Sequence, residues 1–185
     1  MDGMIIAKGT LAGLLASIVI ALLIFIAEVI IGYPHGIFYT VISDALNIDT
    51  MIIVDNKALV GLLLHLTTGT VIGAIASISF SNLLLQLALS LERCILYGTI
   101  VGIVTWLTVF LPISYIVVIP LLNTHEYELF GRSGTMVTSD DLKEQFHRIV
   151  YAAIGFHIQY GIIYSIILFV FIGRSIVKRK ESLGI

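Results

Sequence analysis

Four long apolar stretches divide the chain, and polar or charged residues separate them. They run approximately over 4–31, 58–80, 94–119 and 149–172. Each reaches the roughly 20 residues that a helix needs to cross a hydrocarbon core about 30 Å thick. Backbone groups in lipid must be bonded within their own segment, so each stretch is predicted to be a helix. The sequence therefore predicts an all-α membrane protein, with four transmembrane helices in one bundle and one domain over 1–185.

The connections between these stretches differ in length. Residues 81–92 make a short link, whereas 32–57 and 120–148 are each long enough for structure of their own. The segment 36–54 mixes aromatic and aliphatic residues with scattered acids, so we expect it to lie along the membrane interface. The first stretch is too long for a signal-peptide core and has no clear small-residue cleavage site, so we expect it to be retained.

Two positions in the long connections are predicted to start helices. The tetrapeptide 138–141, Thr-Ser-Asp-Asp, combines a capping hydroxyl with acids in the first turn, and both favour a helix N terminus. The fourth helix is thus predicted to begin before the membrane and to run inward through Arg148. Asp55 is a similar candidate cap for the second helix.

Basic residues predict the orientation of the bundle. Six lie at one set of helix ends: Lys8, Arg93, Arg174, Lys178, Arg179 and Lys180. Four lie at the other: Lys57, Arg132, Lys143 and Arg148. Because the side richer in Lys and Arg stays in the cytoplasm, we expect a multi-pass protein of the cell membrane with both termini cytoplasmic.

Composition agrees with a membrane protein and narrows the partners. Only 12% of residues are charged and 58% are hydrophobic, whereas a soluble domain carries about 25% charged residues. The net charge of −2 does not favour a nucleic-acid partner. Cys94 is the single cysteine, so no intrachain disulfide can form, and it is best interpreted as a small apolar filler.

Small residues recur at helical spacing and suggest an internal repeat. Gly9 and Gly13 in the first stretch match Gly98 and Gly102 in the third, 89 positions later. In the second stretch His65 precedes Gly69, Gly73 and Ser77 at four-residue intervals, and in the fourth His157 precedes Gly161 and Ser165 in the same way, with 92 positions between the histidines. A duplicated two-helix unit, related by an axis along the membrane normal, is the preferred interpretation.

The glycines have a simple packing role. Residues four apart share one helix face, and glycine there lets two backbones approach closely. The predicted packing positions are Gly9, Gly13, Gly69, Gly73, Gly98, Gly102 and Gly161. A hinge or a pore lining is the alternative role for these positions.

Three ionisable residues lie inside the apolar stretches: Glu28, His65 and His157. At 1.5 Å per residue, both histidines are expected roughly 10–12 Å below the same surface. Each stands one turn from a glycine on its small-residue stripe, so each is predicted to face the bundle interior. In a parallel repeat the two imidazoles would face each other across the pseudo-twofold axis.

Three interpretations of this candidate site stay open. Each histidine could simply bond a hydroxyl or carbonyl of a neighbouring helix; the candidates nearby are Thr67, Thr68, Gln159, Tyr160 and Tyr164. His65 and His157 could hold haem or a transition metal, since neutral imidazole serves both. Two histidines are too few for a closed zinc site, so Glu28 would have to contribute. Finally, Glu28 could belong to a proton or solute path.

Short motifs throughout the spans carry a family resemblance. They are 9–13 (Gly-Thr-Leu-Ala-Gly) with Glu28 before Tyr33 and Pro34, His65 at the head of a Gly-rich helix, Gly98 to Gly102 ahead of Trp106 and Pro112, and 155–161 (Gly-Phe-His-Ile-Gln-Tyr-Gly). At these residues the chain resembles the YagU-like group of uncharacterised prokaryotic inner-membrane proteins. Tyr164 and Ser165 depart from the Leu-Gly pair often found in such relatives. The resemblance implies a four-helix membrane protein and no established reaction.

No nucleophile–histidine–acid set, phosphate loop or redox CxxC is present, so the sequence favours a protein that is not an enzyme. We expect a small membrane protein that supports a larger membrane complex or passes a small solute or proton. Its expected partners are the lipid bilayer and further copies or other subunits. The alternative is a haem- or metal-binding redox protein that uses His65 and His157.

Overall fold

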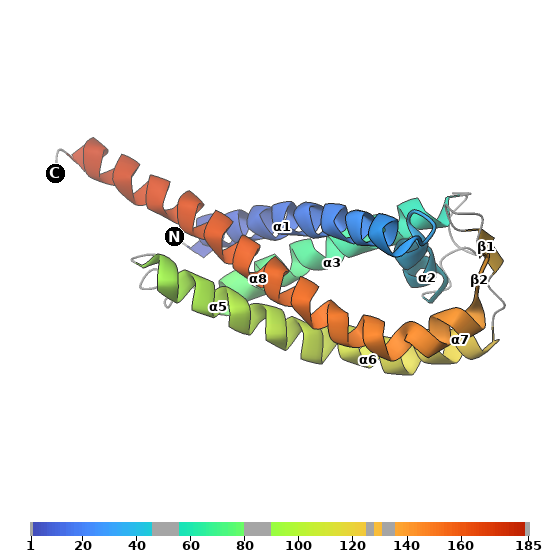
Figure 1. Cartoon of the computed structure of the whole chain (residues 1–185). Coiled ribbons are helices and arrows are strands. Elements are labelled where there is room, and N and C mark those ends of the chain that lie inside the picture. The colour runs from blue at the N-terminus through green and yellow to red at the C-terminus, as the bar shows by residue number, and fades with distance from the viewer. Residues whose placement is uncertain (1, 46–55, 80–89, 125–127, 131–135, 184–185) are drawn as a thin grey trace.

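The computed structural model describes residues 2–45, 56–79, 90–124, 128–130 and 136–183. Four helices are long and apolar enough to cross a membrane, over Gly3–Ile31, Lys57–Ile78, Leu91–Asn123 and Arg148–Ile172. They pack together as a bundle, which confirms the predicted fold class (Figure 1). The third span is longer at both ends than its apolar stretch predicted.

The elements in chain order are α1 (Asp2–Ile31), α2 (Ile37–Ala45), α3 (Lys57–Ser79), α5 (Leu91–Thr105), η2 (Trp106–Phe110), α6 (Leu111–Ile113), η3 (Ser114–Val118), α7 (Ile119–Thr124), β1 (Glu128–Phe130), β2 (Met136–Thr138) and α8 (Ser139–Leu183). β1 and β2 pair antiparallel, with Leu129 opposite Val137. Both long connections therefore have structure of their own, as their lengths indicated. The strand pair itself was not expected from the sequence.

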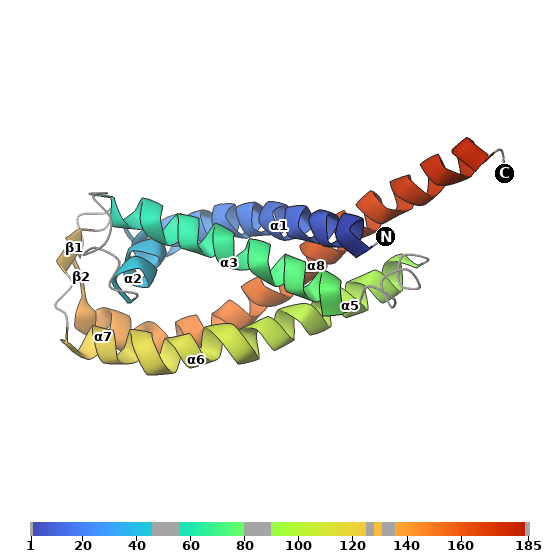
Figure 2. The ribbon, with the colours of Figure 1, turned by 180° about the vertical axis from the view of Figure 1, so that it is seen from behind.

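The four spans form two pairs, each made of two successive spans. α1 packs along α3, α5 packs along α8, and α1 also contacts α8, which joins the pairs. The pairs lie close together near the start of α1 and separate toward the end that carries α2, β1 and β2 (Figures 1 and 2). α8 continues well beyond the other helices at the opposite end (Figure 1).

α2 lies where the two pairs separate and contributes to both apolar clusters of the core. Tyr39, with Phe38 and Ile42, packs against the large cluster built mainly by α1, α3, α5 and α8. Ile37 and Val41 belong to a smaller cluster around Leu122 and Val150. Since opposite faces of one short helix are covered in this way, α2 acts as a spacer between the pairs. Residues 46–55 of this connection lie outside the described part of the chain, so the predicted interfacial segment is only partly described.

The third span contains two prolines and two widened turns. Pro112 and Pro120 have no N–H to donate, and each follows a π-helical turn, η2 or η3. In these turns the N–H of Leu111 donates to the Trp106 carbonyl and that of Ile119 to the Ser114 carbonyl, five residues back. Local widening of this kind lets a membrane helix continue through proline without leaving backbone groups unbonded.

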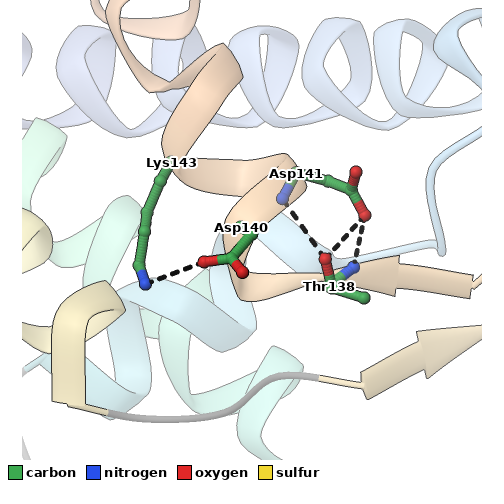
Figure 3. Close-up of polar contacts among 4 residues, drawn as sticks. All are labelled: Thr138, Asp140, Asp141 and Lys143. Carbon is green, nitrogen blue, oxygen red and sulfur yellow. Dashed lines mark hydrogen bonds and ion pairs between the residues drawn. The ribbon is translucent and has the colours of Figure 1, made fainter.

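The predicted start of α8 is confirmed. The Thr138 hydroxyl accepts a bond from the Asp141 N–H at 3.3 Å, and the Asp141 carboxylate accepts bonds from the Thr138 N–H and hydroxyl, both at 2.8 Å (Figure 3). These bonds lower the pKa of Asp141. The candidate cap Asp55 lies outside the described residues. The Asn56 side-chain carbonyl instead accepts the Leu59 N–H at the start of α3, at 3.1 Å.

Candidate functional site

Glycines form the seam between α1 and α3. A Cβ added at Gly73 would lie 2.6 Å from the Gly9 carbonyl oxygen and 2.8 Å from the Gly13 Cα. A Cβ at Gly9 or Gly69 would collide with the hydroxyl of Ser77 or Ser17, respectively. Both serines are fully buried, and each donates back to the carbonyl four residues earlier. The backbones of α1 and α3 therefore approach closely at these glycines.

The seam between α5 and α8 repeats this arrangement. A Cβ at Gly98 would collide with the Gly161 carbonyl and the Ser165 hydroxyl, and one at Gly102 with the His157 carbonyl. Gly98 and Gly102 thus occupy the places of Gly9 and Gly13. All of the sequence-predicted packing glycines lie in one of these two seams.

The matching contacts set a different register from the one suggested by the histidines. Gly161 corresponds to Gly73 and Ser165 to Ser77, 88 positions apart in both cases. In this register His157 corresponds to Gly69, and its backbone carbonyl faces Gly102. His65 lies one turn before Gly69, so the two histidines do not occupy equivalent positions in the paired helices.

Glu28 holds the start of α2. Its two carboxylate oxygens accept bonds from the backbone N–H groups of Gly36, at 2.7 Å, and Phe38, at 3.1 Å. The chain reaches this position through a turn in which Gly32 and Gly36 have φ of 85° and 77°, conformations that favour glycine. A carboxylate at a helix N terminus satisfies orphan N–H groups and complements the helix dipole. Glu28 is thus a buried cap that fixes the spacer helix to α1.

His65 bonds across the first helix pair. Its Nε2 lies 3.3 Å from the Ser17 carbonyl oxygen, and its ring meets Tyr39 of α2 edge to face. Since a carbonyl only accepts, Nε2 must carry the proton in this contact. The partner is a carbonyl of a neighbouring helix, as one of the three interpretations expected, but none of the candidate side chains provides it.

His157 bonds within its own helix and not, as that interpretation expected, to a neighbouring one. Its Nδ1 lies 2.8 Å from the Ala153 carbonyl oxygen, and its ring packs against Phe110 at a centroid distance of 4.9 Å. Among the described residues, no group of three or more His, Cys, Asp or Glu gathers in a way that could hold a metal ion. Glu28, His65 and His157 therefore each have a separate backbone partner.

Three tyrosines join the helix pairs, a role that the sequence did not reveal. The hydroxyls of Tyr160 and Tyr164 donate to the carbonyls of Gly69, at 2.6 Å, and Gly73, at 3.1 Å. Tyr97 likewise donates to the Ala76 carbonyl, at 3.1 Å. All three acceptors belong to α3, and all three donors belong to the second pair. The spacing of Tyr160 and Tyr164, four residues apart, is the one sequence signal that could have indicated a shared face.

Two buried hydroxyls of α2 contrast with these tyrosines. Tyr39 and Ser43 are fully buried. Within the described part of the chain, neither hydroxyl has a hydrogen-bond partner. Both lie on one face of the spacer helix, one turn apart.

No protein-family model, curated protein or solved structure matches this chain.

Proposed function

We propose that the protein is a non-enzymatic, multi-pass protein of the cell membrane that acts as an accessory subunit of a larger membrane assembly. The observation that carries this proposal is the use of the intramembrane polar side chains. Glu28 bonds the start of α2, His65 bonds α1, and Tyr160 bonds α3. Groups committed to internal backbone partners stabilise a fixed arrangement of helices, which suits a structural subunit more than a conduit.

The proposed orientation places both termini in the cytoplasm. It rests on the larger number of basic residues at the end where α1 begins and α8 ends. The proposal also includes a duplicated helix pair, supported by the matching seams of Gly9 with Ser77 and Gly98 with Ser165. The resemblance to the YagU-like group supports the same architecture and adds no reaction.

Isolation of the protein within patches of its own membrane tests the accessory role. Extraction with a lipid-retaining polymer, followed by mass spectrometry, should recover a second protein in a fixed ratio. Recovery of this chain alone, in repeated preparations, would contradict the proposal.

Flux measurements distinguish the competing conduit. In sealed vesicles the purified protein should pass no protons above the rate of protein-free vesicles. Flux that is lost in Glu28→Gln but kept in Asp44→Asn would favour a proton path instead. Asp44 is the matched control because it is an acid outside the spans that pairs with Lys57 at 2.8 Å.

A haem- or metal-binding redox protein is the second candidate, and one observation favours it. Each histidine donates one ring N–H to a carbonyl, which leaves Nδ1 of His65 and Nε2 of His157 as acceptors. Metal-binding histidines are commonly oriented by such a bond from their other nitrogen. Purified protein with a visible haem band or a stoichiometric metal, lost in both His65→Ala and His157→Ala, would support this candidate. Colourless, metal-free protein would count against it.

A further inference from the structure

One face of α8 is turned away from the rest of the bundle. Gly161 and Ser165 pack on α5, while Ala152, Gly155 and Gln159 on the opposite side of the helix are exposed. The exposed stripe continues through Ile166 and Val170. We call Ala152, Gly155, Gln159, Ile166 and Val170 the outer face of α8. In Figure 1 α8 passes in front of the other helices, and none of them covers it on that side.

Gln159 is out of place on this face. It lies 11 residues beyond Arg148 in the span Arg148–Ile172, which is roughly 16 Å along the helix and thus near the middle of a bilayer. Its side chain is exposed, and within the described part of the chain no hydrogen bond to its amide is found. A primary amide carries two donors and an acceptor, and hydrocarbon can satisfy none of them. Glu28 and His65, by contrast, are bonded inside the bundle.

The residues beside Gln159 allow another helix to approach. A Cβ added at Gly155 would meet nothing within 4 Å, in contrast to the seam glycines. Ala152, one turn before Gly155, is also exposed. Small residues beside a polar one form the common contact surface between membrane helices, where the polar group bonds across the interface.

We propose that the outer face of α8 binds the same face of a second copy of this chain, with the two Gln159 amides bonded to each other. Copies with the same orientation are related by a twofold axis along the membrane normal, so every residue on that axis meets its own counterpart at the same depth. An amide is both donor and acceptor, so two copies of Gln159 are complementary without any other group. The inference rests on the membrane insertion proposed above, but it does not require a second kind of subunit.

Cysteine cross-linking in membranes tests the contact directly. In a Cys94→Ala background, which removes the only native thiol, Gly155→Cys should form a disulfide-linked dimer on mild oxidation. Leu63→Cys is the control, because Leu63 is 55% exposed on α3 and lies at a similar distance from the same end of its span. Equal cross-linking at both positions, or none at Gly155→Cys, would overturn the proposal.

The role of the amide is tested by replacing it. In vesicles, energy transfer between labelled copies at increasing lipid dilution gives the dimer dissociation constant, and Gln159→Leu should raise it roughly ten-fold. Thr68→Val is the matched control, since Thr68 is also exposed and lies 11 residues into its span, on α3. It should leave the constant unchanged.

The remaining outcomes separate this inference from the accessory role. An unchanged dissociation constant in Gln159→Leu, or a monomer at every dilution, would overturn the second-copy proposal and leave the accessory role untouched. A different protein that co-purifies with wild type but not with Gln159→Leu would also overturn it, because the outer face would then belong to another partner. A dimer without any further subunit would support this inference and count against the accessory role.

Discussion

Each helix pair has a seam of the same kind, and the two pairs differ at the end where they separate. In α1–α3 the seam is built from glycine on both helices, Gly13 against Gly73; in α5–α8, Gly102 meets the carbonyl of His157. α1 is a regular helix that ends at a glycine turn, whereas the third span widens twice before its prolines. The part that is alike sets the distance between two backbones, and the part that differs carries Glu28 in the first pair and the strand pair in the second.

Within one bundle, the seams therefore depend on backbone packing, and the ends at which the pairs separate depend on specific polar contacts. Close approach needs glycine on only one of the two helices at this level: Gly102 faces the backbone carbonyl of His157, whose ring packs against Phe110. The ends at which the pairs separate differ: Glu28 fixes a spacer helix in the first pair, and a strand pair leads into α8 in the second. Variants that affect one pair and not the other therefore test the comparison.

The largest effect is expected from adding a methyl group inside each seam. Gly73→Ala and Gly102→Ala each place a methyl group against backbone of the facing helix, 2.8 Å from Cα of Gly13 and of Ile158, respectively. Backbone cannot move aside as a flexible side chain can, so each variant should lose about 3 kcal/mol of stability, the upper part of the usual range for overpacking. Unfolding in mixed micelles, followed by circular dichroism, measures the loss.

Gly155→Ala is the control for both seam variants, because its added methyl group meets nothing within 4 Å. It should unfold like wild type under conditions where the protein is monomeric. A seam variant as stable as this control would show that the corresponding pair is not closely packed, and a loss in only one of the two would mean that the seams are not alike.

The fold could be predicted because its main determinants are local. Four long apolar stretches, a capping sequence at 138–141 and glycines four apart are all properties of short segments. The way in which the two glycine seams correspond could not be predicted in the same way, because His65 and His157 have the same sequence spacing to the glycines that follow them. Only the contacts between backbones distinguish Gly69 from His65 as the counterpart of His157.

Removal of the Glu28 cap should weaken the start of α2, the spacer between the two pairs. Glu28→Ala leaves two N–H groups at the start of α2 without an acceptor, and a hydrogen bond to a charged group contributes about 1.5–3 kcal/mol. We expect a loss of about 2 kcal/mol, near the middle of that range, with a smaller loss for Glu28→Gln. Hydrogen exchange of the Gly36 and Phe38 amides should accelerate in both variants.

Glu92→Gln provides the control, since Glu92 is an exposed acid in the first turn of α5, in the other pair. It should leave exchange in α2 unchanged. Unaltered protection of Gly36 and Phe38 in Glu28→Ala would show that α2 is held by its apolar contacts and not by the carboxylate.

Removing a tyrosine hydroxyl that joins the helix pairs should lower stability, whereas removing the Tyr39 hydroxyl of α2 should not. Tyr160→Phe removes the bond to the Gly69 carbonyl and should cost about 1 kcal/mol, the typical net value of one hydrogen bond. Tyr39→Phe removes a buried hydroxyl with no partner among the described residues, so stability should be equal or higher. The same unfolding measurement compares them, and a larger loss for Tyr39→Phe would mean that its hydroxyl has a partner in the membrane.

These tyrosines also explain why the candidate site could be predicted only in part. Glu28, His65 and His157 stand out because ionisable groups are rare in apolar stretches. Their partners are backbone carbonyls and N–H groups, which every residue carries and no sequence pattern marks. Tyr160 and Tyr164 were candidates as partners of the histidines, yet they bond α3 carbonyls, because the helix pairs approach each other at that level.

The smallest effect is expected at the helix starts, where the two pairs should respond differently to acid. Asp141 has its pKa lowered by the bonds from Thr138, so its contribution to stability is present above the pKa of the unfolded chain, about 4, and is lost as pH falls through the lower folded value. α3 begins instead at the neutral amide of Asn56.

Amide exchange in the first turn of α8 should therefore accelerate below about pH 4 beyond the change seen at the start of α3. Asp141→Asn should remove this difference, while Asp140→Asn, which only alters the ion pair with Lys143, should keep it (Figure 3). Identical acid profiles in wild type and Asp141→Asn would mean that the first turn of α8 is held by the strand pair rather than by its cap.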